Sequence, residues 1–191
     1  MRNARITEYF GDDEYDFRLA YGQLLELQEK TGLGPFALYR RFMEDNWGVA
    51  DIFETIRIGL IGGGMSPRDA FKLAKKYVQN DPPLEWLNLA RIILIAGLHG
   101  APDEDKAATK KDEEAAVDDD GKLRSRDDYG IGAVMGYTPQ DVDDMTLHQR
   151  NAAFEGYADF HNQKGGGMSE KDKDELFEMV QEEQRKIDGE A

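Results

Sequence analysis

The sequence contains no cysteine, only three histidines and only two tryptophans in 191 residues. The absence of cysteine excludes disulfide bonds, cysteine-ligated zinc and thiol catalysis. A long hydrophobic run is also missing, because the longest apolar stretch, Ile92 to Leu98, is far shorter than the roughly 20 residues that span a bilayer. Met1 to Phe10 lacks the apolar run and small-residue cleavage site of a secretory signal. We therefore expect a cytoplasmic protein.

The side chains that commonly carry out catalysis are few and scattered. His99, His148 and His161 fall on three separate predicted segments, and no two of them have the spacing of metal ligands. Ser66 and Ser169 are placed as helix caps, and no serine has a base at a spacing that would activate it. We expect no enzyme activity, no metal and no cofactor, and an enzyme with an unrecognised site is the least favoured alternative.

Acidic residues dominate the charge. The chain has 39 acidic and 24 basic residues, which gives a formal net charge of -15. Such a field repels the phosphates of nucleic acids and the headgroups of anionic lipids, so neither is an expected partner. A binding role therefore points to other proteins, and self-association stays open.

The hydrophobic pattern predicts a mainly α fold with a small N-terminal β-hairpin. Alternating apolar residues from Arg5 to Leu19, interrupted at Gly11-Asp12-Asp13, indicate the hairpin. Helical spacing with capping and breaking residues then predicts five helices. These run from Tyr21 to Thr31, from Pro35 onwards, from Val49 to Ile61, from the Ser66-Pro67 cap to between Tyr77 and Asn80, and from Leu84 to Gly97.

A change in composition divides the chain after residue 100. Ala101 to Asp128 has 11 acidic and 6 basic residues and almost no large apolar side chain, which predicts a disordered acidic linker between a helical domain at 4–100 and a small helical module at 129–162. Within this module we predict helices to about Met135, from Pro139 to Asp144 and from Leu147 to about His161. A glycine spacer and a charged terminal helix follow at 163–191. The module is short enough to need a partner for its order.

Two glycine-rich runs and one acidic run only partly match ligand-binding motifs. The acidic run that leads to Gly121 fails the calcium-loop pattern at two ligand positions. The glycines of 130–136 do not have dinucleotide-binding spacing, and Gly62-Gly63-Gly64 is not followed by the lysine of a phosphate loop. Close helix packing and helix termination explain these glycines better.

Apolar and aromatic side chains are the remaining candidates for function, as a partner-binding surface. A core position is favoured for Trp47 and Trp86, because aromatic residues dominate cores. For Phe154, Tyr157 and Phe160, core and partner surface are equally supported, because their module is too short to bury all three. The predicted partner-binding residues are Trp47, Ile52, Phe53, Ile56, Leu60, Trp86, Leu87, Ile93, Phe154, Tyr157 and Phe160.

The stretch from Phe10 to Gly100 resembles the phage tail assembly chaperones of the gene transfer agent type. The resemblance rests on the hairpin with Phe10-Gly11-Asp12, on Gly34-Pro35-Phe36, on Trp47 and above all on the run from Asp51 to Met65. It covers about half of the chain. It implies a chaperone domain of a hairpin and helices that coats the tape-measure protein during tail assembly.

The later part of the chain resembles the second reading-frame product found beside such chaperones. Gly136-Tyr137-Thr138-Pro139, Met145-Thr146 and Phe154-Glu155-Gly156-Tyr157 carry this resemblance, although Leu147 stands where an aromatic residue is common. It implies that the module recruits the major tail-tube protein. It also suggests a programmed frameshift, for which Lys110-Lys111 is a candidate site that the gene sequence would test. The alternative function is a structural minor tail component retained in the particle.

Overall fold

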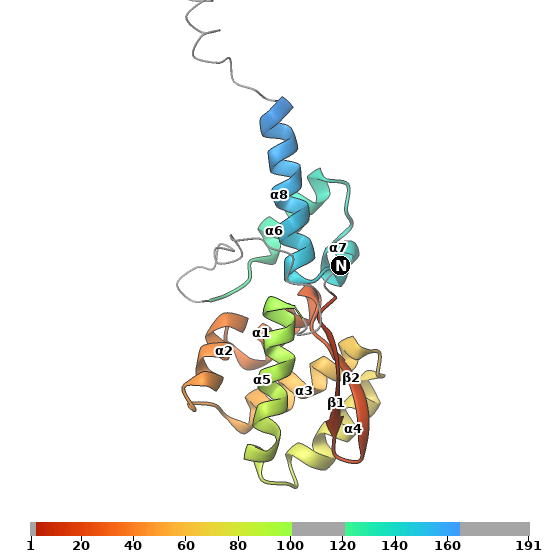
Figure 1. Ribbon diagram of the computed structural model, residues 1–191, viewed down its shortest axis with the longest axis vertical. Helices are drawn as coiled ribbons and strands as arrows, with labels where there is room; N and C mark the ends of the chain where they lie inside the picture. The colour runs from red at the N-terminus through yellow and green to blue at the C-terminus, as the bar shows by residue number, and fades with distance from the viewer. Residues whose placement is uncertain (1–2, 101–120, 165–191) are drawn as a thin grey trace, which may run out of the picture. The chain divides into compact units, whose positions relative to one another are not determined.

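The computed structural model describes residues 3–100 and 121–164 (Figure 1). Most of the predicted linker, the glycine spacer and the terminal helix after Ser169 lie outside the described residues. In chain order the elements are β1 (Arg5–Phe10), β2 (Asp13–Arg18), α1 (Tyr21–Thr31), α2 (Pro35–Met43), α3 (Val49–Gly63), α4 (Pro67–Val78), α5 (Pro83–His99), α6 (Ser125–Val134), α7 (Pro139–Asp144) and α8 (Leu147–Lys164). The predicted fold class, mainly α with an N-terminal hairpin, is confirmed.

The hairpin is antiparallel and pairs Ile6 with Phe17 and Phe10 with Asp13. The two residues between its strands form the turn, and Gly11 there has a φ of 73°, which few other residues adopt at low cost. A Cβ on Gly11 would lie 2.1 Å from the ring of Tyr77 on α4, so the turn also needs glycine for space. The alternation predicted from the sequence places Ile6, Phe10 and Phe17 on the buried side.

Helix α3 is the central element of residues 3–100, and it contacts β2, α1, α4 and α5. Figure 1 shows it between the hairpin and α5. Its C-terminal glycines let β2 approach closely. Cβ atoms on Gly62 and Gly63 would lie 2.0 Å from the carbonyl oxygen of Arg18 and 1.8 Å from that of Asp16. Gly64, which has a φ of 112°, ends the helix. Both explanations given for the glycine run are therefore correct, each for different residues.

The predicted helix caps are present. The backbone N–H of Asp69 donates to the Ser66 hydroxyl oxygen at 3.2 Å, at the start of α4. At the start of α7, Thr138 and Asp141 cap each other's backbone groups, as a capping box requires. Thr146 and Gln149 do the same in the first turn of α8. Local sequence signals therefore place these three helix starts correctly.

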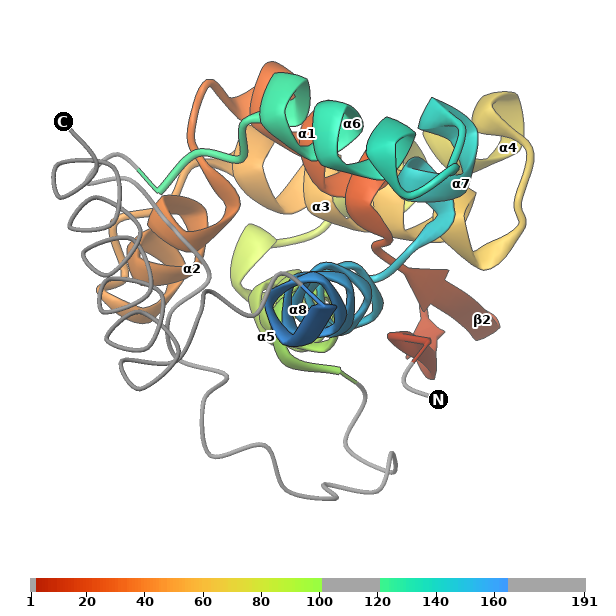
Figure 2. The same ribbon diagram turned by 90° about the horizontal axis from the view of Figure 1, so that it is seen from above.

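The described residues up to 154 belong to one compact unit, and the described residues from 155 onwards belong to a second. Within the first unit, we call residues 121–154 the docked segment. Its helix α7 packs against α1, and its helix α6 packs against α7. Figure 2 shows α6 and α7 alongside α1. Helix α6 begins at Ser125, four residues before the predicted start of the module, because contacts to distant residues hold its first turn. The predicted domain boundaries at residues 100 and 128 stay a prediction.

Within the described ranges, no helix combines the length and the apolar character of a membrane span.

The close approach of β2 to α3 gives a stability prediction. Gly63→Ala should lower the free energy of unfolding by about 2 kcal/mol, because the new methyl group meets a backbone carbonyl that cannot move without shifting the hairpin. Urea unfolding followed by tryptophan fluorescence measures the change.

The matched control is Gly130→Ala in α6, where a Cβ meets nothing within 4 Å. This variant should be neutral or more stable by about 0.5 kcal/mol, because alanine is the better helix former. Equal effects of the two substitutions would contradict the packing argument.

Candidate functional site

Six of the eleven predicted partner-binding residues lie in the hydrophobic core of residues 3–100. They come from α3 and α5, and none is more than 8% exposed. They are Ile52, Phe53, Ile56, Leu60, Leu87 and Ile93. A partner could reach them only if the domain opened, so partner binding by these residues stays a prediction that demands a conformational change.

Both tryptophans pack against the core, which agrees with the favoured interpretation. Trp86 makes edge-to-face contact with Phe10, with ring centroids 5.0 Å apart, and lies 5.8 Å from the Tyr77 ring. Its indole Nε1 is buried without a hydrogen-bond partner in the described structure. Trp47 is half-buried against the same core.

The three aromatic residues of α8 differ in their surroundings. Phe154 is half-buried, with the Arg150 guanidinium 5.8 Å from its ring centroid. Tyr157, in the second unit, stacks on His161 one helical turn later at 3.9 Å. Phe160 is 52% exposed. Of the three, Phe160 is the most exposed, since Phe154 and Tyr157 are both half-buried.

A buried ion pair within the docked segment lies against Tyr21 of α1. Arg150 Nη1 lies 2.7 Å from the Asp128 carboxylate, and the two side chains are only 9% and 15% exposed. The hydroxyl of Tyr21 donates to the same carboxylate, and the Arg150 guanidinium lies 5.0 Å above the Tyr21 ring. Burial, together with the hydrogen bond to Asp128, raises the pKa of the Tyr21 phenol. Tyr21 therefore stays a neutral donor at any physiological pH.

A second tyrosine connects α6 to α7 beside this ion pair. Tyr129 donates its hydroxyl to Asp143 at 2.6 Å. Burial and this hydrogen bond raise the pKa of Tyr129 to about 12. The rings of Tyr21 and Tyr129 meet edge to face at 6.5 Å, so the two hydrogen-bonded tyrosines form one cluster.

Backbone contacts set the position of the docked segment along α1. The Gln28 side-chain amide exchanges two hydrogen bonds with the backbone of Leu123, at 2.8 and 3.2 Å. At the other end of α1, the Tyr21 N–H donates to the Met145 carbonyl at 2.8 Å, and Arg18 donates to the Asp144 carbonyl at 2.7 Å. Contacts at both ends of α1 define one docking position.

Apolar side chains are exposed on α6 and in the turn that follows it. We call Ile131, Val134, Met135 and Tyr137 the α6 patch. Ile131, Val134 and Tyr137 are 42%, 69% and 36% exposed, and Met135 is half-buried. The twelve residues from Tyr129 to Gln140 carry no charge, in a chain that is 33% charged. Met43 and Leu84 are other exposed large apolar side chains, and both lie in residues 3–100.

The residues of the α6 patch were not among the partner-binding residues predicted from the sequence. The glycines of 130–136 were compared there with dinucleotide-binding motifs, and a helix was predicted to about Met135. The available signal was the helical i, i+3, i+4 spacing of Ile131, Val134 and Met135. Gly132 explains part of the glycine content, because its Cβ would lie 2.7 Å from the Val142 side chain of α7.

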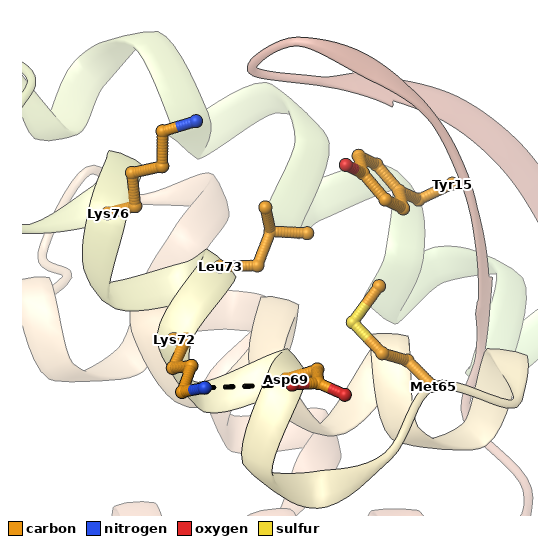
Figure 3. Close-up of a pocket in the computed structure, with 6 residues that line it drawn as sticks. All are labelled: Tyr15, Met65, Asp69, Lys72, Leu73 and Lys76. Carbon is orange, nitrogen blue, oxygen red and sulfur yellow. Dashed lines mark ion pairs between the residues drawn. The ribbon is translucent and has the colours of Figure 1, made fainter.

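A shallow hollow of about 290 Å³ lies between β2 and α4 (Figure 3). Tyr15, Met65 and Leu73 supply its apolar lining. At its rim, Lys76 forms an ion pair with Asp12 at 3.0 Å, whereas Lys72 approaches Asp69 only at 4.0 Å. The hollow is therefore suited to an apolar side chain rather than to an ion. No three His, Asp or Glu side chains of the described ranges gather in a way that could hold a metal.

A family model described as phage tail tube protein, GTA-gp10, matches residues 3–100. The chain belongs to this family. The match confirms the coarser part of the resemblance stated from the sequence: the protein is related to the tails of phages and gene transfer agents. The family description names a tail tube protein, whereas the resemblance suggested an assembly chaperone. No curated protein and no solved structure matches the chain.

The matched range includes glycines at which the packing leaves little room for a side chain. Gly59 lies within it, and a Cβ there would be 2.9 Å from Ile93 and 3.3 Å from Phe17. The α6 patch and the docked segment lie outside the match, so membership of the family does not account for them.

The buried ion pair gives a prediction for the docked segment. Asp128→Ala leaves Arg150 buried without its carboxylate, which should cost roughly 3 kcal/mol in the stability of docking. Tyr21→Phe removes only one hydrogen bond to a charged group and should cost about 1.5 kcal/mol. Hydrogen exchange measured by mass spectrometry should show faster exchange of α6 and α7 in both variants, and the increase should be larger in Asp128→Ala than in Tyr21→Phe.

Tyr137→Phe is the control, because the Tyr137 hydroxyl has no partner within the described structure. Unchanged exchange of α6 in Asp128→Ala would mean that other contacts hold the segment.

Proposed function

We propose that the protein is a non-enzymatic chaperone of tail assembly. In this proposal the domain of residues 3–100 binds the tape-measure protein, and the docked segment recruits the tail-tube protein through the α6 patch. The observation that carries the proposal is the patch itself, an uncharged apolar surface that a buried ion pair holds in place. The protein would act in the host cytoplasm and be absent from finished particles.

Clustered apolar side chains at a surface favour a protein partner. An exposed apolar patch promotes aggregation unless a partner covers it, and interface centres are typically apolar, with aromatic residues and methionine enriched. The α6 patch offers Tyr137 and Met135 beside two aliphatic side chains. Exposed Asp127 and Asp141 lie at either end of the uncharged run. The complementary surface on the tube protein would therefore be apolar with a basic rim.

The hollow between β2 and α4 supports a role for the N-terminal domain. A tape-measure protein presents long amphipathic helices, and a helix of this kind binds by placing apolar side chains in a groove. Tyr15, Met65 and Leu73 offer such a place on the surface of a domain whose core is already closed. Binding at the hollow would not require the domain to open.

A minor tail component retained in the particle is the second candidate function. The family description, which names a tail tube protein, favours it. The charge argues against it, because stacked copies that each carry a net charge of -15 repel one another. Mass spectrometry of purified particles separates the two: the chaperone should be absent, and stoichiometric amounts would support the structural role.

The test of the α6 patch uses the full chain co-expressed with the tail-tube protein. Val134→Asp places a charge at the centre of the patch and should abolish co-purification of tube protein while tape-measure binding persists. The protein should stay folded, because Val134 is 69% exposed.

Leu84→Asp is the matched control, because Leu84 is 68% exposed on α5 and the substitution is chemically the same. It should bind tube protein as the unsubstituted chain does. If Val134→Asp also binds normally, the α6 patch is not the recruiting surface.

A further inference from the structure

Helix α4 is basic in an otherwise acidic chain. It carries four basic side chains and one acidic side chain within twelve residues. Arg68, Phe71, Lys72 and Lys75 have the spacing i, i+3, i+4, i+7, which places them on one side of the helix. All four are exposed. We call this surface the α4 face.

The charges of the α4 face are largely unpaired. Arg68 and Lys75 form no ion pair with any described residue. Lys72 approaches Asp69 only at 4.0 Å, with both side chains more than 60% exposed, and such a pair contributes little. Elsewhere in the domain, cations are neutralised more fully. Arg57, for example, binds both Glu26 and Glu54 within 2.8 Å.

An exposed aromatic ring lies among these cations. Phe71 is 47% exposed, and its ring meets Phe53 of α3 edge to face at 5.7 Å. Val49, one helical turn before Phe53 on the same side of α3, is 44% exposed. The Phe71 ring is thus supported by the core on one edge and open to solvent on the other. Rigid aromatic rings of this kind often anchor a protein interface.

We propose that the α4 face binds an acidic amphipathic helix of a partner protein. An apolar side chain of that helix would contact Phe71, and carboxylates three or four residues away would pair with Arg68, Lys72 and Lys75. The net charge of -15 repels an acidic ligand elsewhere, so the α4 face fixes where it binds. The same net charge argues against a nucleic acid or an anionic membrane as the partner, because the acidic surface of the chain would repel the dense negative charge of either.

This inference deepens the proposed function and rests on it in one respect: the partner is the tape-measure protein. Lys72 lines both the α4 face and the hollow of Figure 3, so the two surfaces adjoin. A tape-measure segment that binds here should therefore be acidic beside its apolar side chains.

The experiment titrates the full chain, labelled for NMR, with two synthetic amphipathic helices that share their leucines but carry either glutamate or lysine beside them. The glutamate peptide should shift the amide resonances of α4 and of the start of α3, and its affinity should fall as salt is added. The lysine peptide should not shift α4. Equal shifts from both peptides, or none in α4 from the glutamate peptide, would overturn the proposal.

Charge reversal tests the named residues. Lys72→Glu with Lys75→Glu should weaken the glutamate peptide by about tenfold, because two exposed ion pairs are lost. The matched control is Lys30→Glu with Arg40→Glu, which makes the same charge change at exposed positions of α1 and α2. If the two double variants weaken binding of the glutamate peptide equally, net charge alone explains the effect. That result would contradict a defined binding site.

Co-expression with the tape-measure protein separates this inference from the proposed function. If the full chain binds tape measure and the Lys72→Glu, Lys75→Glu variant binds it equally well, the α4 face is wrong and the proposed function stands. If the glutamate peptide binds at α4 but tape measure does not co-purify, the surface stands and the proposed function fails. Binding at α4 of an oligonucleotide or an anionic vesicle, without binding of the peptide, would also refute the inference.

Discussion

The ion pair between Asp128 and Arg150 lies against the ring of Tyr21. The Tyr21 hydroxyl donates to Asp128, which is 107 residues away in sequence. Burying two charges is costly unless both are paired and hydrogen-bonded, and a pair of this kind specifies position more than it adds stability. Here the carboxylate accepts from both Tyr21 and Arg150. The cluster, together with the contacts of Gln28 and Arg18 to backbone groups, sets where the docked segment lies on α1.

Within one compact unit, residues 3–100 and the docked segment therefore contribute differently to the core and to the surface. Residues 3–100 close their own core around α3, and the docked segment adds Val142 and Leu147 to it. The α6 patch stays exposed because α6 packs on α7 through Gly132, which leaves the apolar side chains on its other side uncovered. In the proposed function, two binding surfaces on one chain hold tape measure and tube protein near each other, which raises the effective concentration of the second for the first.

Features specified by neighbouring residues were predicted well from the sequence. The hairpin follows from alternation around Gly11, and the starts of α4, α7 and α8 follow from caps at Ser66, Thr138 and Thr146. The start of α6 was missed, because Leu123 and Asp128 are held by Gln28 and Tyr21, and no local pattern reveals partners so distant. Core membership of Ile52 and Ile93 could not be separated from partner binding for a related reason: an apolar stripe has the same pattern whichever protein covers it.

The most direct test asks whether the docked segment lies on α1 of its own chain. The natural sequence has no cysteine, so Gly22→Cys with Asp143→Cys introduces the only two thiols. A Cβ on Gly22 would lie 3.0 Å from the Asp143 Cβ, within a small adjustment of the roughly 3.8 Å found in disulfides. Gly22→Cys with Asp141→Cys is the control. Non-reducing mass spectrometry should find a disulfide within one chain for the first pair alone. Equal yields for both pairs, or disulfides only between chains, would contradict the account.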